Sequence, residues 1–286
     1  MGTDSLMRLQ YAIAATKFGG GQRTISAKAR TGGLRAFEQV VDVLQPAERQ
    51  LVEDQAEELF DSGVDAVLLG QENYPDALAA SRQAPAAVFS KGPIELLRRR
   101  AIGVCGSRQA SAEGLRAAHA CSDAAARRGY CVVSGYAKGV DLAAHSAALA
   151  AGGTTVIVLA EGINHFRVRR GEFSDLWDPA RALVVSQFAP DQKWFASGAM
   201  TRNAVISELS RALVVVEAGE KGGTLAAGEY ALQRNQLVLA LQLFDAAPGN
   251  KLLIANGAKV IRSRQHLEAA LDYLDRGKSF EQLTLM

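Results

Sequence analysis

Residues 101–111 read AIGVCGSRQAS, a short aliphatic run followed by a glycine and a polar stretch that ends in serine. The aliphatic run is typical of a strand buried in a parallel sheet, and Gly106 permits a tight turn at its end. Ser111 is of a residue type that caps helices, so a helix is predicted to follow at once. The segment therefore predicts a strand, a turn and a helix in succession.

The same succession recurs along the chain. Most of the aliphatic runs are separated by alanine-rich stretches with helical spacing, which predicts an α/β fold with a doubly wound, mostly parallel sheet. The predicted strands are 101–105, 131–134, 155–159, 182–186, 213–217 and 237–241, and a further strand begins within 64–69. The predicted helices that accompany them are 111–128, 140–151, 224–234 and 263–277.

The beginning of the chain has a different pattern. Helical spacing over 6–17, 34–44 and 47–61, interrupted by glycines, predicts a small helical N-terminal module in which no residue pattern points to chemistry. We therefore expect three parts: this module over 1–60, an α/β core over 61–275 and a C-terminal tail over 276–286.

The composition is that of a folded protein without membrane segments. Of the 286 residues 48% are hydrophobic, and no apolar run approaches the roughly 20 residues of a membrane helix. The chain begins without the pattern of a secretion signal, so we expect a cytoplasmic protein. Its cysteines, Cys105, Cys121 and Cys131, lack metal-ligand spacing and are expected to be buried free thiols. Because the formal net charge is only +2, affinity for nucleic acid requires a local basic patch.

In an open parallel sheet, ligands bind beyond the carboxyl ends of the strands. The loop after 101–105 contains Gly106, Ser107 and Arg108, and exposed amides at the following helix start would suit a phosphate. The loop lacks the G-x-G-x-x-G pattern of dinucleotide sites. An ordinary strand-to-helix turn is an equally good interpretation.

The loop after 131–134 offers a second anion contact. It places Lys138 beside Gly139 at a predicted helix start. Asp141 and His145 share a face of that helix. We favour a structural Asp–His pair, because no nucleophile is clearly supplied for a catalytic one.

A third glycine loop, Gly222-Gly223-Thr224, follows the strand 213–217 and opens the helix that carries Glu229. One such loop is weak evidence, but the topology brings three of them to one edge of the sheet. Their combination predicts a ligand that bears phosphate.

Further basic and aromatic residues flank these loops. Arg167, Arg169 and Arg170 follow a strand on the same edge and are candidates for additional basic contacts, whereas the arginines of 98–100 and 127–128 lie at the opposite strand ends and are expected to be solvated. The aromatic pair at 194–195 is interpreted either as a base-stacking surface or as packing over the sheet edge.

Together these motifs resemble the DprA/Smf family of DNA-processing proteins over roughly residues 60–265. The most specific stretch, SGYAKGVDLAAHSAAL over 134–149, is similar to the family pattern S-G-x-A-x-G-[IV]-D-x-x-A-H-x-x-A-L. Other matching segments occur in the family's order: 73–78, 89–92, 106–108, 202–203, 216–218, 223–225 and 248–258.

The resemblance implies a Rossmann-like core that binds single-stranded DNA, forms a homodimer and delivers the strand to the RecA recombinase in natural transformation or a related DNA transaction. No catalytic residue, metal or cofactor is implied. The residues that match the family's DNA pocket are Gly106, Ser107, Arg108, Lys138, Arg202 and Asn203. The glycine loops add Gly139, Gly222, Gly223 and Thr224 as phosphate-binding candidates.

Some positions depart from the family pattern. Ala204 stands where the family usually has a second arginine after Arg202-Asn203, and His165-Phe166 replaces a Tyr-Pro. The sequence also ends without the winged-helix domain of some members, which would fit a divergent paralogue serving defence or another DNA transaction.

Two other functions remain open on the sequence alone. Gly222-Gly223-Thr224 with Glu229 is faintly similar to the P-G-G-x-G-T-x-x-E motif of lysine-decarboxylase-like phosphoribohydrolases, although the spacing to the glutamate differs. A domain that senses a free nucleotide without cleaving it would use the same loops.

Overall fold

The computed structural model describes residues 2–168, 171–243 and 246–276. Within these ranges the chain forms nine strands. Their bounds are β1 Val64–Leu68, β2 Ala87–Lys91, β3 Ala101–Cys105, β4 Cys131–Ser134, β5 Thr155–Val158, β6 Ala182–Ser186, β7 Ala212–Val215, β8 Leu237–Leu241 and β9 Lys259–Ile261.

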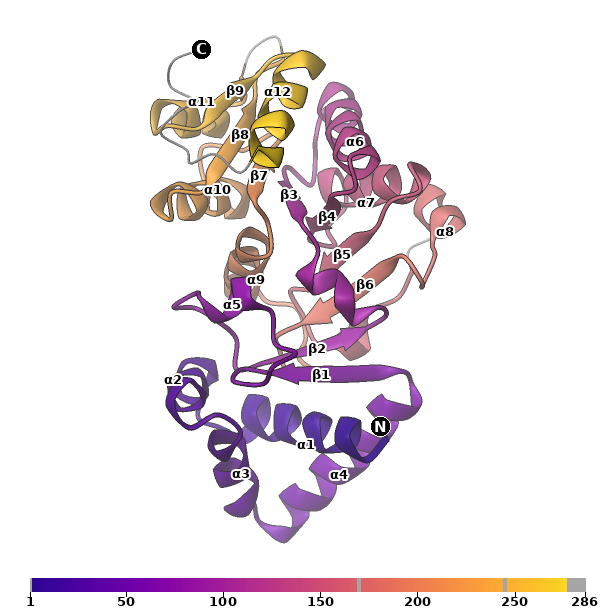
Figure 1. The fold of residues 1–286 in the computed structure, drawn as a ribbon, viewed down its shortest axis with the longest axis vertical. Helices are drawn as coiled ribbons and strands as arrows, with labels where there is room; N and C mark the ends of the chain where they lie inside the picture. Colours follow the sequence, from indigo (N-terminus) through magenta and orange to yellow (C-terminus); the bar gives the residue numbers. More distant parts are fainter. Residues whose placement is uncertain (1, 169–170, 244–245, 277–286) are drawn as a thin grey trace.

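The strands make one sheet that extends along most of the molecule, in the order β1-β2-β6-β5-β4-β3-β7-β8-β9 (Figure 1). From β6 to β9 every neighbouring pair is parallel. Strand β2 continues the sheet antiparallel to β6, and β1 pairs antiparallel with β2 at the edge. The prediction of a doubly wound, mostly parallel α/β sheet is confirmed.

Helices cover both faces of the parallel strands because successive side chains of a strand point to opposite faces. In β3, Ile102 and Val104 belong to one buried cluster and Ala101 and Cys105 to the other. The first cluster includes α6 (Ala112–Arg127), α7 (Val140–Ala150) and α12 (Arg264–Asp275). The second includes α9 (Ala196–Glu208), α10 (Gly223–Gln233) and α11 (Pro248–Ala255), and Figure 1 shows α6 and α7 on the other side of the strands from α9 and α10.

The chain reverses its direction of travel across the sheet at β3, the middle parallel strand. After β3 it proceeds outward through β4, β5 and β6, and α9 then carries it back to β7 on the other side of β3. Such a switch point opens a crevice at the carboxyl ends of the strands, because the loops on its two sides diverge. The candidate loops after β3, β4 and β7 all lie at this edge of the sheet.

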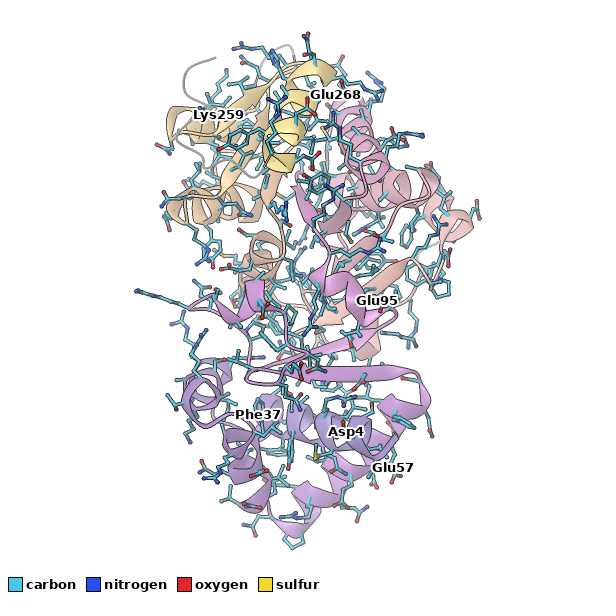
Figure 2. All side chains as sticks on the ribbon, in the orientation of Figure 1. Asp4, Phe37, Glu57, Glu95, Lys259 and Glu268 are labelled. Atoms are coloured by element: carbon cyan, nitrogen blue, oxygen red, sulfur yellow. The ribbon has the colours of Figure 1, made fainter. Side chains whose placement is uncertain are left out.

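Four helices precede the sheet, where the sequence predicted three. They are α1 Gly2–Phe18, α2 Gln22–Gly32, α3 Arg35–Asp42 and α4 Pro46–Asp61. The prediction missed α2, which follows the left-handed Gly20 and Gly21 and buries Ile25 and Ala29. Helix α1 packs against β1 and β2 and α4 against β1, whereas α2 and α3 pack against each other and against α1. Phe37 (labelled in Figure 2) is fully buried in the cluster that reaches the sheet. The division at 1–60, 61–275 and 276–286 stays a prediction.

Two strands were also missed, β2 and β9. The second has three residues at the edge of the sheet, too few for periodicity to reveal. The predicted strand 213–217 is displaced, since β7 runs over Ala212–Val215 and its last predicted residue, Glu217, already belongs to the loop.

The cysteines are buried and free, as predicted. Burial raises the pKa of Cys105 and Cys121 to about 12 and that of Cys131 to about 11, so the thiols are poor nucleophiles at neutral pH. Among the described residues, no helix has the length and apolar character to cross a membrane. The same ranges contain no cluster of three or more histidine, cysteine or acidic side chains able to hold a metal ion.

Candidate functional site

The glycine loops after β3, β4 and β7 are hydrogen-bonded to one another. Thr224 of the third loop donates its hydroxyl hydrogen to the carbonyl of Gly106 in the first, with 3.1 Å between the oxygens. The amide of Val140 at the end of the second loop donates to the carbonyl of Ser107 over 3.4 Å. Asn203 on α9 donates to the carbonyl of Gly223 over 3.0 Å. The structure thus brings together the loops that the sequence places at one edge.

A cleft of about 500 Å³ opens beside the first two loops. Arg108 and Lys138 both line it, although 30 residues separate them along the chain, because β3 and β4 are parallel neighbours. The full lining is Arg108, Gln109, Tyr136, Ala137, Lys138, Leu159, Ala160, Glu161, Trp194 and Arg202. Its size is in the range of pockets that bind small ligands or a few groups of a polymer.

Arg202 forms the buried wall of this cleft. Its side chain is 9% exposed, and its Nη1 lies 3.9 Å from Oδ2 of Asp141, whose side chain is 8% exposed. The Nε of Arg202 is buried and has no hydrogen-bond partner in the structure as described. Burial lowers the pKa of Arg202 from its usual value, although Asp141 opposes that shift. A buried guanidinium with donor capacity to spare can bind an anion that enters the cleft.

Gly135 makes room for this arrangement. A Cβ on Gly135 would lie 1.6 Å from Nη1 of Arg202 and 2.4 Å from Oδ2 of Asp141. Gly139 has a similar requirement, because its φ is +83° and a Cβ there would lie 2.5 Å from the carbonyl oxygen of Ser107. Both glycines therefore have steric roles, and Gly139 shapes the site through the backbone.

The cations at the mouth of the cleft are available to a ligand. Lys138 and Arg108 are exposed, and neither is ion-paired with a carboxylate of the described residues. The guanidinium of Arg108 lies over the ring of Trp194, 5.2 Å from its centre. Glu161 is the acidic member of the lining and opposes the positive potential of the three basic side chains.

The start of α6 differs from the expectation. The predicted phosphate site at the start of α6 is partly filled by Glu217, which accepts hydrogen bonds from the amide of Ser111 at 2.9 Å and from its hydroxyl at 2.5 Å. The Ser111 hydroxyl in turn caps the amide of Gly114. The expectation of exposed amides at this helix start is therefore wrong for these groups, because the chain supplies its own carboxylate.

The third loop contributes less to the cleft than the first two. Gly222 and Gly223 are exposed at the start of α10, but they and Thr224 are outside the cleft lining, as is Asn203. The hydroxyl of Thr224 and the amide group of Asn203 are engaged in joining the loops.

Asp141 and His145 have separate partners, so the predicted Asp–His pair is wrong. Asp141 accepts from the amide of Ala137 at 3.1 Å and pairs with Arg202. His145 is fully buried; its Nε2 donates to the carbonyl of Gly135 at 2.6 Å, and its Nδ1 lies 2.6 Å from the hydroxyl of Thr155. Burial lowers the pKa of His145 to about 4, which keeps the ring neutral. Its role is to hold Gly135 in place.

The additional basic contacts are not part of the cleft as described. Arg167 lines a different cavity and donates to the carbonyls of Asn164 and Phe166. Arg169 and Arg170 lie outside the described residues. The two aromatic residues differ: Trp194 is 48% exposed and lines the cleft, whereas Phe195 is 37% exposed and packs against Phe188 with 5.5 Å between ring centres.

Sequence reasoning missed Glu161 and Tyr136. Each follows a strand at the same edge as the chosen residues, and that position was the signal that could have found them.

Comparison with known proteins identifies the family. A model of the family described as DNA recombination-mediator protein A matches residues 65–272. The chain belongs to this family. It is 32% identical over 215 residues to the DNA processing protein DprA of Bacillus subtilis, covering 72% of this chain and 71% of the relative. It is 31% identical over 203 residues to DprA of Streptococcus pneumoniae, covering 70% and 72%.

Solved structures agree with this assignment. The DNA processing protein A of Streptococcus pneumoniae superimposes with a TM-score of 0.73 at 27% identity, covering 91% of this chain and 97% of that one. The Helicobacter pylori protein, studied for its single-stranded DNA binding mode, shares the fold with a TM-score of 0.63 at 20% identity, covering 73% and 96%. The Rossmann-like fold and the membership in a DNA-processing family are thereby established for this chain.

Proposed function

We propose that the protein binds single-stranded DNA in the cleft beside β3 and β4 and hands it on within a DNA transaction, without chemical turnover. The observation that carries the proposal is the meeting of Arg108, Lys138 and Arg202 around one cleft at the switch point of the sheet. Phosphodiester groups are the anions that such a set of cations would neutralise.

The site has a form suited to an unpaired strand. Trp194 presents an exposed aromatic ring next to the cations, and stacking on aromatic rings is available only to bases that are not paired and stacked in a duplex. Contacts between the cleft cations and the DNA phosphates do not depend on base identity, so we propose binding with little sequence preference.

The family assignment supports a finer role. We propose that the protein is a homodimer that protects incoming single strands and loads them onto a RecA-type recombinase in the cytoplasm, in natural transformation or a related DNA transaction. Gly106, Ser107, Arg108, Lys138, Arg202 and Asn203 are carried over as the DNA-contacting set, with Gly139, Gly222, Gly223 and Thr224 supporting the loops.

The rival function, cleavage of a nucleoside monophosphate, has little support. Glu229, its catalytic candidate, lies on α10 outside the cleft lining. A domain that senses a free nucleotide would use the same cations. A binding experiment distinguishes this function from the binding of single-stranded DNA.

The experiment compares a fluorescein-labelled oligothymidylate with a nucleoside monophosphate as ligands of the purified protein. Tight binding of the oligonucleotide, weak binding of the monophosphate and no release of free base are expected. Repeated release of base that Glu229→Gln abolishes would replace the proposal with the phosphoribohydrolase function.

A further inference from the structure

The segment between β6 and α9 joins the N-terminal helices to the cleft. It runs over residues 187–195, makes a turn at 189–192 and carries Trp194 just before α9 begins. No residue pattern in the N-terminal helices points to a chemical role. The contacts of these helices with the turn indicate a functional role.

Asp191 in this turn bonds to three separate parts of the chain. Its Oδ1 accepts from the side-chain amide of Asn164 at 2.7 Å. Its Oδ2 lies 3.6 Å from Nζ of Lys17 on α1 and accepts a hydrogen bond from the side-chain amide of Gln55 on α4. Two N-terminal helices and the segment after β5 therefore meet at one carboxylate.

Further hydrogen bonds to backbone carbonyls hold the same segment. The amide of Gly162 donates to the carbonyl of Gln192 at 2.7 Å, and the amide of Asn164 donates to the carbonyl of Pro190 at 3.1 Å. A Cβ on Gly162 would lie 2.0 Å from the oxygen of Pro190, so this close approach requires glycine. On α2, Gln22 donates from its side chain to the carbonyl of Gln187.

Trp194 follows this turn closely in the chain. Its ring is 48% exposed, and its described ring contact is with the flexible side chain of Arg108. It stands only three residues after Asp191, a reach of about 10 Å of extended chain. A turn held at Asp191 therefore limits the directions in which the indole can point.

We propose that Asp191 is a positioning residue that lets helices α1 and α4 hold Trp194 against the cleft for stacking on a DNA base. The inference rests on the proposed function, because stacking requires a single strand in the cleft. It gives the N-terminal helices a part in binding: they fix the angle at which the segment enters α9.

The test begins without DNA, in a Trp177→Phe background that leaves Trp194 as the one tryptophan of the chain. We expect Asp191→Ala to lower the fluorescence anisotropy of Trp194 and to increase its quenching by acrylamide. Asp191→Asn keeps an oxygen for Asn164 but loses the charge that faces Lys17. Its anisotropy and quenching should lie between those of wild type and Asp191→Ala. Glu57→Ala, an exposed acidic residue of α4 (Figure 2), is the matched control and should match wild type.

The second stage is a double-mutant cycle with a labelled oligothymidylate. Trp194→Ala should weaken binding about five-fold or more, and Asp191→Ala about three-fold. In the Trp194→Ala background, Asp191→Ala should cause no further loss, because its effect passes through the indole. Thermal unfolding of each variant shows that it is folded at the assay temperature.

The outcomes separate the inference from the function on which it rests. An equal loss from Asp191→Ala with and without Trp194, or an unchanged anisotropy, overturns the positioning role while DNA binding stands. A wild-type protein that fails to bind the oligonucleotide overturns the proposed function, whatever the anisotropy shows.

Discussion

The two ends of the parallel strands both carry arginines, yet they differ in what those arginines contact. At the amino ends, Arg100 pairs with Asp275 at 2.7 Å, Arg127 with Asp123 at 3.0 Å and Arg128 with Asp272 at 2.5 Å. At the carboxyl ends, Arg108 and Lys138 line a cleft without an ion pair to the described carboxylates. Three arginines at the amino ends are thus paired with carboxylates, whereas Arg108 and Lys138 at the carboxyl ends have no such partner among the described residues.

This difference indicates that an anion site is better recognised by cations without a carboxylate partner than by the number of cations. Another cavity, at the amino ends, is lined by Arg98, Arg99, Arg100 and Arg211 but also by Glu72, Asp76 and Glu208. A phosphate there would meet carboxylates as well as arginines. The following experiments test or refine the contrast between the two edges.

The largest effect is expected from Arg202→Met. It removes the buried cation of the cleft and leaves Asp141 without its charge partner, so the free energy of unfolding should fall by about 3 kcal/mol, and oligonucleotide binding should be lost. Urea unfolding and binding titrations measure the two effects.

Adding Asp141→Asn to Arg202→Met provides the control. Removing the unpaired negative charge of Asp141 should recover part of the free energy of unfolding without recovering oligonucleotide binding. Full recovery of binding would mean that Arg202 serves only the fold.

Acid should destabilise the folded protein through the buried His145. Its pKa is lowered to about 4 in the folded protein, so between pH 6.5 and 4 the unfolded chain binds the proton more readily. Stability contributed by the neutral ring is present above pH 6.5 and is lost as the pH falls, by about 3 kcal/mol at pH 4. Urea unfolding at successive pH values should show this slope, and His145→Gln should flatten it.

Arg108→Ala and Lys138→Ala should each weaken single-strand binding about ten-fold for every sequence tested, because each removes a charged group that binds phosphate. The log–log dependence of affinity on salt should become shallower by about 0.7 for each phosphate that is no longer neutralised. Binding titrations at several salt concentrations, with circular dichroism as a check on folding, measure this.

Arg99→Ala at the amino edge is the matched control and should bind like wild type. If Arg99→Ala abolished binding while the two cleft variants kept it, the assignment of the edges would be reversed.

The smallest effect is expected from Glu161→Gln. Removing the acidic group from a partly exposed cleft should tighten binding about two- to five-fold and leave the fold unchanged. A loss of affinity would mean that Glu161 accepts a hydrogen bond from the DNA.

Much of the fold was predictable because buried parallel strands leave a strong local pattern. The predicted strand 101–105 coincides with β3 and 131–134 with β4, since each is an aliphatic run that ends at a glycine loop. The edge strand β9 and the helix α2 were missed because short or polar elements carry little periodicity, and packing against their neighbours stabilises them.

The sequence by itself determined that glycine loops follow the strands and that Arg108 and Lys138 lie on them. Only the tertiary structure decided which charges remain free. Glu217 fills the start of α6, and Asp141 pairs with Arg202 instead of His145, because these partners come from elements distant in the sequence. The positions of buried strands along the chain follow from local patterns, but an ion pair depends on ångström-scale distances that packing alone fixes.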